Sequence, residues 1–98
     1  MTVTVRLKIK GRVQGVGYRA WCMHAARGFG LSGWVRNLTD GSVEAMARGP
    51  QAAVDALVMA CESGPVSARV TSVETMELEY AEMSPDSFQQ YPTAQADD

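Results

Sequence analysis

The residues best suited to chemistry lie in a glycine-rich segment, residues 11–19 (GRVQGVGYR). Its three glycines within seven residues exclude a helix interior and predict a loop. Gly15 and Gly17 let consecutive backbone N–H groups point into one concavity, and their missing side chains let a phosphate oxygen approach closely. Arg19 stands where a helix is expected to begin, and its guanidinium can bind two phosphate oxygens at once. The segment therefore indicates a phosphate-binding loop or, in the simpler interpretation, a tight connection between a strand and a helix.

The same loop does not match the common nucleotide-binding motifs. It lacks the Gly-Lys-Ser/Thr ending of a P-loop, which argues against a nucleoside triphosphatase. It also lacks the third glycine and the parallel strand–helix–strand unit of a dinucleotide site. A phosphate group bound in this loop would therefore belong to another kind of substrate.

The chain offers little for metal or thiol chemistry. Its cysteines are Cys22 and Cys61, and its one histidine is His24. These three residues are scattered, whereas a structural zinc site usually takes four Cys or His ligands. We therefore expect no metal site and no cofactor, and we interpret both cysteines as small buried hydrophobic residues. His24 is expected at a helix surface or in the core.

Periodicity along the chain predicts the elements that hold the loop. Residues 3–10 alternate between apolar and polar, which is typical of a strand with one buried face. Apolar residues between Ala20 and Phe29, among them Trp21, recur at helical spacing. We then expect a strand at residues 31–38, which includes Trp34 as a core residue, a hairpin turn at 39–41 and a strand at 43–48. A helix at 50–63, a long strand at 70–80, a turn at 84–86 and a short strand at 88–91 should follow.

The order of these elements predicts the fold class. It reads β-α-β-β-α-β with an additional short strand, and each helix has a single apolar stripe, so both helices should cover one face of the sheet. This is the α+β, ferredoxin-like split β-α-β sandwich, with a mainly antiparallel sheet of four or five strands. We expect one domain at residues 1–91, followed by a polar, disordered tail at residues 92–98.

Composition and charge narrow the functional classes. The chain has 98 residues and a net charge of −2, and it contains neither a membrane-spanning apolar run nor a secretion signal, so a cytoplasmic protein is expected. Residues 1–48 hold eight basic and two acidic residues, and residues 49–98 hold one basic and nine acidic residues. This asymmetry favours a local anion site, although basic strand residues could instead pair with acidic ones across the sheet.

Two segments carry a resemblance to a known family. Residues 11–19 resemble the first signature of the acylphosphatases, and residues 33–43 (GWVRNLTDGSV), followed by Gly49, resemble the second. The resemblance spans about residues 3–80 in element order. Tyr18 stands where the family commonly has Phe, and its hydroxyl is expected to add polarity near the loop. Leu38 stands where relatives often have a polar residue.

The resemblance implies hydrolysis of the carboxyl–phosphate bond of acyl phosphates to carboxylate and inorganic phosphate. It places the family's phosphate-binding arginine on Arg19 and its water-orienting asparagine on Asn37. The backbone N–H groups of the loop would complete the phosphate site; these belong to Gly15, Val16, Gly17, Tyr18 and Arg19. No metal or cofactor is required, and the expected partners are a small acyl phosphate and inorganic phosphate. We expect a monomer without a nucleic-acid or membrane partner.

Two other functions stay open at this point. Ferredoxin-like domains also bind RNA through aromatic residues on the open sheet face, so a non-catalytic anion- or RNA-binding module is the main alternative. Against it, only 7% of the residues are aromatic. The third possibility is a regulatory domain that binds acyl phosphates within a larger enzyme, such as a carbamoyl-transfer maturation protein.

Overall fold

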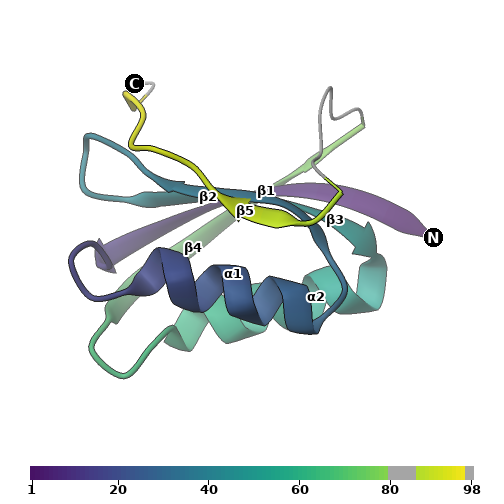
Figure 1. Cartoon of the computed structure of the whole chain (residues 1–98), viewed down its shortest axis with the longest axis horizontal. Helices are drawn as coiled ribbons and strands as arrows, with labels where there is room; N and C mark the ends of the chain where they lie inside the picture. The colour runs from purple at the N-terminus through teal and green to yellow at the C-terminus, as the bar shows by residue number, and fades with distance from the viewer. Residues whose placement is uncertain (80–85, 97–98) are drawn as a thin grey trace.

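The computed structural model describes residues 1–79 and 86–96, and it places a sheet over a layer of two helices (Figure 1). This is the ferredoxin-like α+β fold, and the predicted fold class is confirmed. The elements in chain order are β1 (Thr2–Arg12), α1 (Tyr18–Gly28), β2 (Ser32–Asn37), β3 (Val43–Pro50), α2 (Gln51–Ser63), β4 (Arg69–Leu78) and β5 (Phe88–Gln90). Neither helix is long and apolar enough to cross a membrane, within the ranges that the structure describes.

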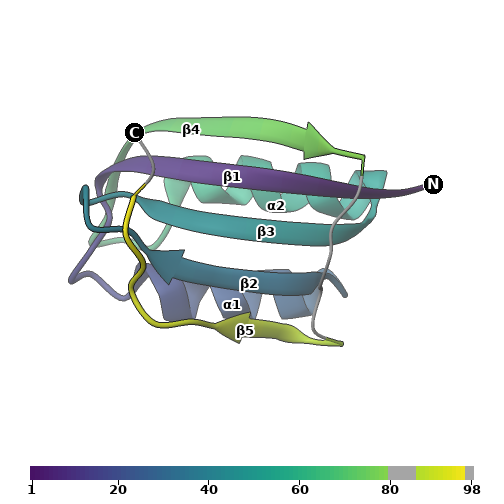
Figure 2. The ribbon, with the colours of Figure 1, turned by 90° about the horizontal axis from the view of Figure 1, so that it is seen from above.

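The strands lie in the order β4-β1-β3-β2-β5, and both helices cover the same face (Figure 2). β1 pairs antiparallel with β3 and β4, and β2 pairs antiparallel with β3. β5 is the exception, because it runs parallel to β2 and extends the sheet beyond it. The sequence pattern did not determine which strand β5 would pair with.

The core lies between the sheet and the helices, and the alternation in β1 explains why. Successive strand side chains point to opposite faces, so the apolar set of β1 faces the helices. Each helix contributes one buried stripe. The buried hydrophobic residues of these three elements are Val3, Val5, Leu7, Ile9, Tyr18, Cys22, Ala26, Val54, Leu57 and Cys61.

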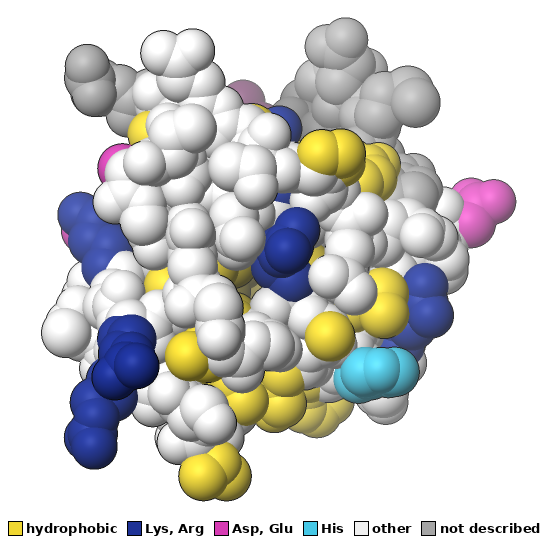
Figure 3. All heavy atoms as spheres, turned by 60° about the vertical axis from the view of Figure 1, so that its left-hand side comes forward, with side chains coloured by type: hydrophobic (Ala, Val, Ile, Leu, Met, Phe, Trp, Pro, Cys, Tyr) yellow, Lys and Arg dark blue, Asp and Glu magenta, His cyan; other side chains and the backbone are white. Residues whose placement is uncertain are grey.

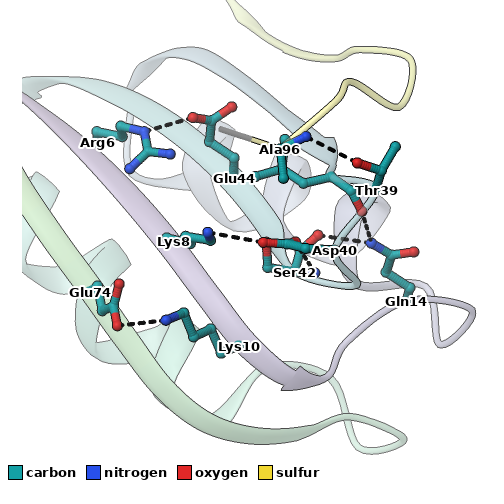
Figure 4. A network of polar contacts seen from close by, with 11 residues as sticks. Arg6, Lys8, Lys10, Gln14, Thr39, Asp40, Ser42, Glu44, Glu74 and Ala96 are labelled. Carbon is teal, nitrogen blue, oxygen red and sulfur yellow. Dashed lines mark hydrogen bonds and ion pairs between the residues drawn. The ribbon is translucent and has the colours of Figure 1, made fainter. Parts of the chain in front are cut away.

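The opposite face of the sheet carries ion pairs between neighbouring strands (Figure 4). Glu44 on β3 accepts from Arg6 Nε at 2.6 Å and from Arg36 Nε at 2.7 Å. Lys8 contacts Asp40 at 3.0 Å, and a further pair joins β1 to β4. The simpler explanation of the basic half of the chain is therefore correct for Arg6, Arg36 and Lys10, which pair with acidic residues of neighbouring strands. Lys8 pairs instead with Asp40 in the turn between β2 and β3.

Two expectations about apolar residues need correction. Trp34 is not in the core, because it lies on the open face, stacked on Tyr91 with ring centroids 5.6 Å apart. The Arg36 guanidinium lies 4.5 Å from the centroid of the same indole. Phe29 is 41% exposed, since α1 ends one residue before it. Tyr80, the expected end of the fourth strand, and most of the expected turn at 84–86 lie outside the described residues.

Candidate active site

The glycine-rich loop connects β1 to α1 and is anchored by its valines. Val13 is buried, and Val16 packs against the core. The glycines between and after them are exposed and adopt left-handed backbone conformations, with φ 74° at Gly15 and φ 78° at Gly17. Glycine adopts this conformation without steric cost, so the sequence permits a turn that other residues would strain.

The loop ends at a helix N-terminus without a counter-charge of its own. Gly17 is the N-cap of α1 and accepts the first helical hydrogen bond from Trp21 N at 3.0 Å. No side chain caps this end, and its first turn contains no Asp or Glu. The N–H groups of a first helical turn have no acceptor within the helix, and the helix dipole adds partial positive charge. This end of α1 is therefore suited to bind an anion.

A cavity of about 250 Å³ opens at this point. Its lining residues are Val13, Gly15, Gly17, Tyr18, Arg19, Ala20, Asn37 and Gln90. The structure thus brings Arg19, Gly15, Gly17 and Asn37 to one hollow. Val16 does not line the cavity, because its side chain packs into the core instead. Figure 3 shows the end of the molecule where these loops meet, with separate Lys and Arg side chains scattered among hydrophobic and uncharged polar atoms.

Arg19 lies in the first turn of α1 and is half-buried. Its Nη1 donates a long hydrogen bond of 3.4 Å to the Tyr91 carbonyl oxygen. This contact is exposed and close to the upper limit for a hydrogen bond, so it constrains the guanidinium only weakly. Arg19 can therefore turn toward an anion in the cavity without losing a strong contact.

Asn37 is the last residue of β2, and its backbone is held on both sides. It pairs with Val43 of β3 on one side, and its carbonyl accepts from Ala94 N at 3.0 Å on the other. Residues 94 and 96 belong to the segment expected to be a disordered tail, and in the structure both make hydrogen bonds. The carboxamide of Asn37 carries a donor and an acceptor at the edge of the cavity.

Sequence reasoning missed Gln14, which joins the loop to the β2–β3 turn (Figure 4). Its Nε2 donates to the carbonyl oxygens of Leu38, at 2.7 Å, and Ser42, at 2.8 Å. The available signal was a polar side chain with two donors among the glycines and valines of residues 11–19. Gln90, which lines the cavity, was also missed, and nothing in its local sequence identifies it.

Tyr18 corrects one expectation. Its side chain is 1% exposed, and its hydroxyl donates to the Cys61 carbonyl oxygen at 2.7 Å, so it ties α1 to α2 instead of adding polarity near the loop. Burial, together with the neighbouring Cys61, raises the pKa of the Tyr18 hydroxyl far above its usual range. Leu38, the other departure from the family pattern, is buried and contributes its backbone to the turn.

The cysteines and the histidine lie away from this chemistry. Cys22 and Cys61 are free and buried, as expected. Contact with the Cys61 thiol and burial raise the pKa of Cys22, so this thiol stays protonated and unreactive. His24 is exposed on α1. Within residues 1–79 and 86–96, no three His, Cys, Asp or Glu residues lie together as metal ligands would.

Comparisons with known proteins agree with this fold. The acylphosphatase family model matches residues 5–90. An acylphosphatase from Rhodospirillum rubrum is 57% identical over 67 residues, which cover 68% of this chain and 74% of the relative. One from Cupriavidus metallidurans is 47% identical over 93 residues, covering 95% of this chain and 96% of the relative. The crystal structure of acylphosphatase from Bacillus subtilis superimposes with a TM-score of 0.86 at 35% identity, covering 91% of this chain and 98% of that one.

The fold and these relatives together define an enzyme that hydrolyses a phosphate-containing substrate and has a ferredoxin-like fold. The chain belongs to the acylphosphatase family, and both the expected family and the expected class of enzyme are confirmed.

Proposed function

We propose that this acylphosphatase binds the phosphoryl group of an acyl phosphate with Arg19 and the N–H groups of residues 15–19. Arg19 supplies a charged, bidentate donor at the start of α1, and the loop supplies amides whose direction the backbone fixes. The observation that carries this assignment is that Arg19, Gly15, Gly17 and Asn37 line a single cavity.

The chemistry of the substrate explains why so few groups suffice. An acyl phosphate loses a carboxylate, a good leaving group that needs no protonation by the enzyme. The transition state of phosphoryl transfer is loose, and its charge spreads over the equatorial oxygens. Fixed amide dipoles and the guanidinium of Arg19 stabilise that charge without reorganising. Binding and electrostatics are therefore the main requirements, and no step needs a metal.

In this mechanism Asn37 orients the attacking water in line with the bond that breaks. Its carboxamide donates one hydrogen bond and accepts another, so it fixes the direction of the water without removing a proton. The proton passes to an oxygen of the substrate's own phosphoryl group. Asn37 thus acts on turnover, and Arg19 acts on both phosphate binding and turnover.

The open face of the sheet offers little to support the RNA-binding alternative. Trp34 stacks on Tyr91 and is covered by the Arg36 guanidinium, so its ring is already engaged. Arg6 and Lys8 are paired with carboxylates. We therefore favour hydrolysis without a nucleic-acid partner, while the monomeric state and cytoplasmic location stay predictions from the sequence.

Release of phosphate from benzoyl phosphate tests these roles. Arg19→Ala should lower kcat/KM by about 100-fold or more, the usual loss of a transition-state donor. Asn37→Ala should lower kcat to a similar degree and leave inhibition by inorganic phosphate unchanged. Arg69→Ala is the matched control, because Arg69 is exposed on β4 and does not line the cavity.

Two outcomes would contradict the proposal. Near wild-type turnover in both Arg19→Ala and Asn37→Ala would show that the roles are assigned to the wrong residues. Loss of activity on addition of a chelator, with recovery on addition of a divalent cation, would contradict the metal-independent mechanism.

A further inference from the structure

The chain beyond β5 continues along the end of β2 and contacts the candidate site. We name residues 91–96 the C-terminal strap. Tyr91 N donates to the Val35 carbonyl at 2.8 Å, which continues the parallel pairing of β5 with β2. Figure 1 shows the yellow end of the chain lying over the end of β2. The strap therefore begins as an extension of the sheet.

Further along, the strap forms a parallel bridge at Leu38 and Ala94. Ala94 N donates to the Asn37 carbonyl at 3.0 Å, and Thr39 N donates to the Ala94 carbonyl at 3.0 Å. Ala96 N then donates to Thr39 Oγ1 at 3.0 Å (Figure 4). These hydrogen bonds surround one short stretch of chain, residues 37–39, whose first member is the proposed water-orienting residue.

The strap matters because residues 37–39 lie at an end of β2 that β5 does not cover. Asn37 is the last residue of β2, and β5 ends at Gln90 before it reaches that point. β3 supports Asn37 on one side through the pairing with Val43, and Ala94 supports it on the other. Without the strap the end of β2 would be an open sheet edge, and such edges open locally at low free-energy cost.

We propose that the C-terminal strap is a positioning element that holds the Asn37 backbone in place for turnover. The proposal rests on the role of Asn37 given above. A reacting group displaced by about 1 Å can cost up to about 100-fold in rate, so a loosened backbone at Asn37 should slow the reaction. The amides proposed to bind phosphate lie in the loop and the first turn of α1, and Arg19 contacts the strap only through its long 3.4 Å hydrogen bond to the Tyr91 carbonyl. Phosphate affinity should therefore be much less sensitive to changes at residues 94–96.

Two proline substitutions separate the key hydrogen bond from general effects on the strap. Ala94→Pro removes the N–H that donates to the Asn37 carbonyl. Gln95→Pro is the matched control, because its N–H takes part in none of the hydrogen bonds among the described residues. Proline also favours an extended conformation in the residue before it, which suits Ala94 in its bridge.

With benzoyl phosphate, Ala94→Pro should lower kcat by about 5- to 20-fold, well within the range of a misplaced reacting group. KM, inhibition by inorganic phosphate and the thermal midpoint should change little, and Gln95→Pro should resemble the wild type. A chain ending at Thr93 should match Ala94→Pro, and a chain ending at Ala96, which keeps every strap hydrogen bond, should match the wild type. Ending at Thr93 also keeps the new carboxylate away from Arg19, which contacts the Tyr91 carbonyl.

A double variant distinguishes failure of the strap from failure of the proposed mechanism. In Asn37→Ala, Ala94→Pro should have no further effect on kcat, because the strap acts through Asn37. Hydrogen exchange at the Thr39 amide should be faster in Ala94→Pro and unchanged in Gln95→Pro. The strap proposal is overturned if Asn37→Ala loses activity and Ala94→Pro does not, or if the two losses multiply. Unaltered turnover in Asn37→Ala would instead overturn the mechanism.

Discussion

Gln14 holds Leu38 by a hydrogen bond of 2.7 Å between its Nε2 and the Leu38 carbonyl, so the glycine-rich loop is fastened to the residue beside Asn37. The second donor of the same amide binds the Ser42 carbonyl at the other end of the β2–β3 turn. One side chain thereby sets the position of the two parts of the site relative to each other. The proposed mechanism requires this spacing, since the phosphoryl group and the water are held by different segments.

Gln14→Glu should therefore lower activity. A carboxylate of nearly the same shape cannot donate to the two carbonyls and would repel them. We expect a fall in kcat with benzoyl phosphate of about 10-fold or more and a loss of about 1–3 kcal/mol in the free energy of unfolding. Gln95→Glu, which adds the same charge at an exposed side chain that makes none of the hydrogen bonds of the described residues, should change neither quantity appreciably. Equal behaviour of the two variants would exclude a positioning role for Gln14.

Gly33→Ala should destabilise the protein severely. Gly33 has φ 136°, and a Cβ added there would lie 1.8 Å from the Met46 carbonyl oxygen. Because that neighbour is backbone in the paired strand, β2 and β3 would have to separate, and we expect a loss of about 3 kcal/mol or more in urea unfolding. Gly28→Ala is the control: its Cβ meets nothing within 4 Å. Helix propensity should leave that variant equal to or about 0.5–1 kcal/mol more stable than the wild type.

Tyr18→Phe should affect stability and leave the chemistry unchanged. The substitution removes the hydrogen bond from the buried hydroxyl to the Cys61 carbonyl, which should cost about 1–2 kcal/mol in the free energy of unfolding. The kcat and KM for benzoyl phosphate should stay at wild-type values, because the hydroxyl is bound to the Cys61 carbonyl between the two helices. Tyr91→Phe, on the exposed side of the Trp34 stack, should retain full stability. A selective loss of kcat in Tyr18→Phe would place the hydroxyl in the reaction.

Asp40 should contribute to the stability of the protein in a pH-dependent way. Hydrogen bonds from the Ser42 hydroxyl and backbone N–H, and the contact with Lys8, lower the pKa of the Asp40 carboxyl below its usual range. The folded pKa therefore lies below the unfolded value of about 3.9, so the unfolded chain takes up the proton first. The stabilisation is complete above about pH 5 and is lost as the pH falls below about 4.

Thermal unfolding of Asp40→Asn across pH 2 to 7 measures this contribution. The wild type should have the higher midpoint at pH 7, and the difference should shrink as the pH falls below about 4. Glu77→Gln, on an exposed β4 side chain outside the ion pairs of the described residues, should show a much smaller pH dependence. A difference between wild type and Asp40→Asn that stays constant with pH would contradict the ionic explanation.

Local patterns in the chain predicted most of the helices and strands and one part of the candidate site, the glycine-rich loop with Arg19. Alternation in residues 3–10 and helical spacing in residues 20–29 predict secondary structure because burial on one face imposes those periods. The glycines before Arg19 indicate a left-handed backbone conformation directly, since few other residues tolerate a positive φ. Trp34 was placed wrongly, because an aromatic residue in a strand can pack on either face and the pattern around it did not decide between them.

What the sequence by itself determined is therefore local: the strands, the helices, and a loop whose backbone can surround an anion. The tertiary structure alone decided which distant segments meet, namely Gln90 at the cavity, Gln14 at the Leu38 carbonyl, β5 beside β2, and Ala94 beside Asn37. The physical reason is that these are backbone and amide contacts between segments far apart in the chain. Any residue can supply a backbone N–H or carbonyl, so such contacts leave no signature in the residue types that make them.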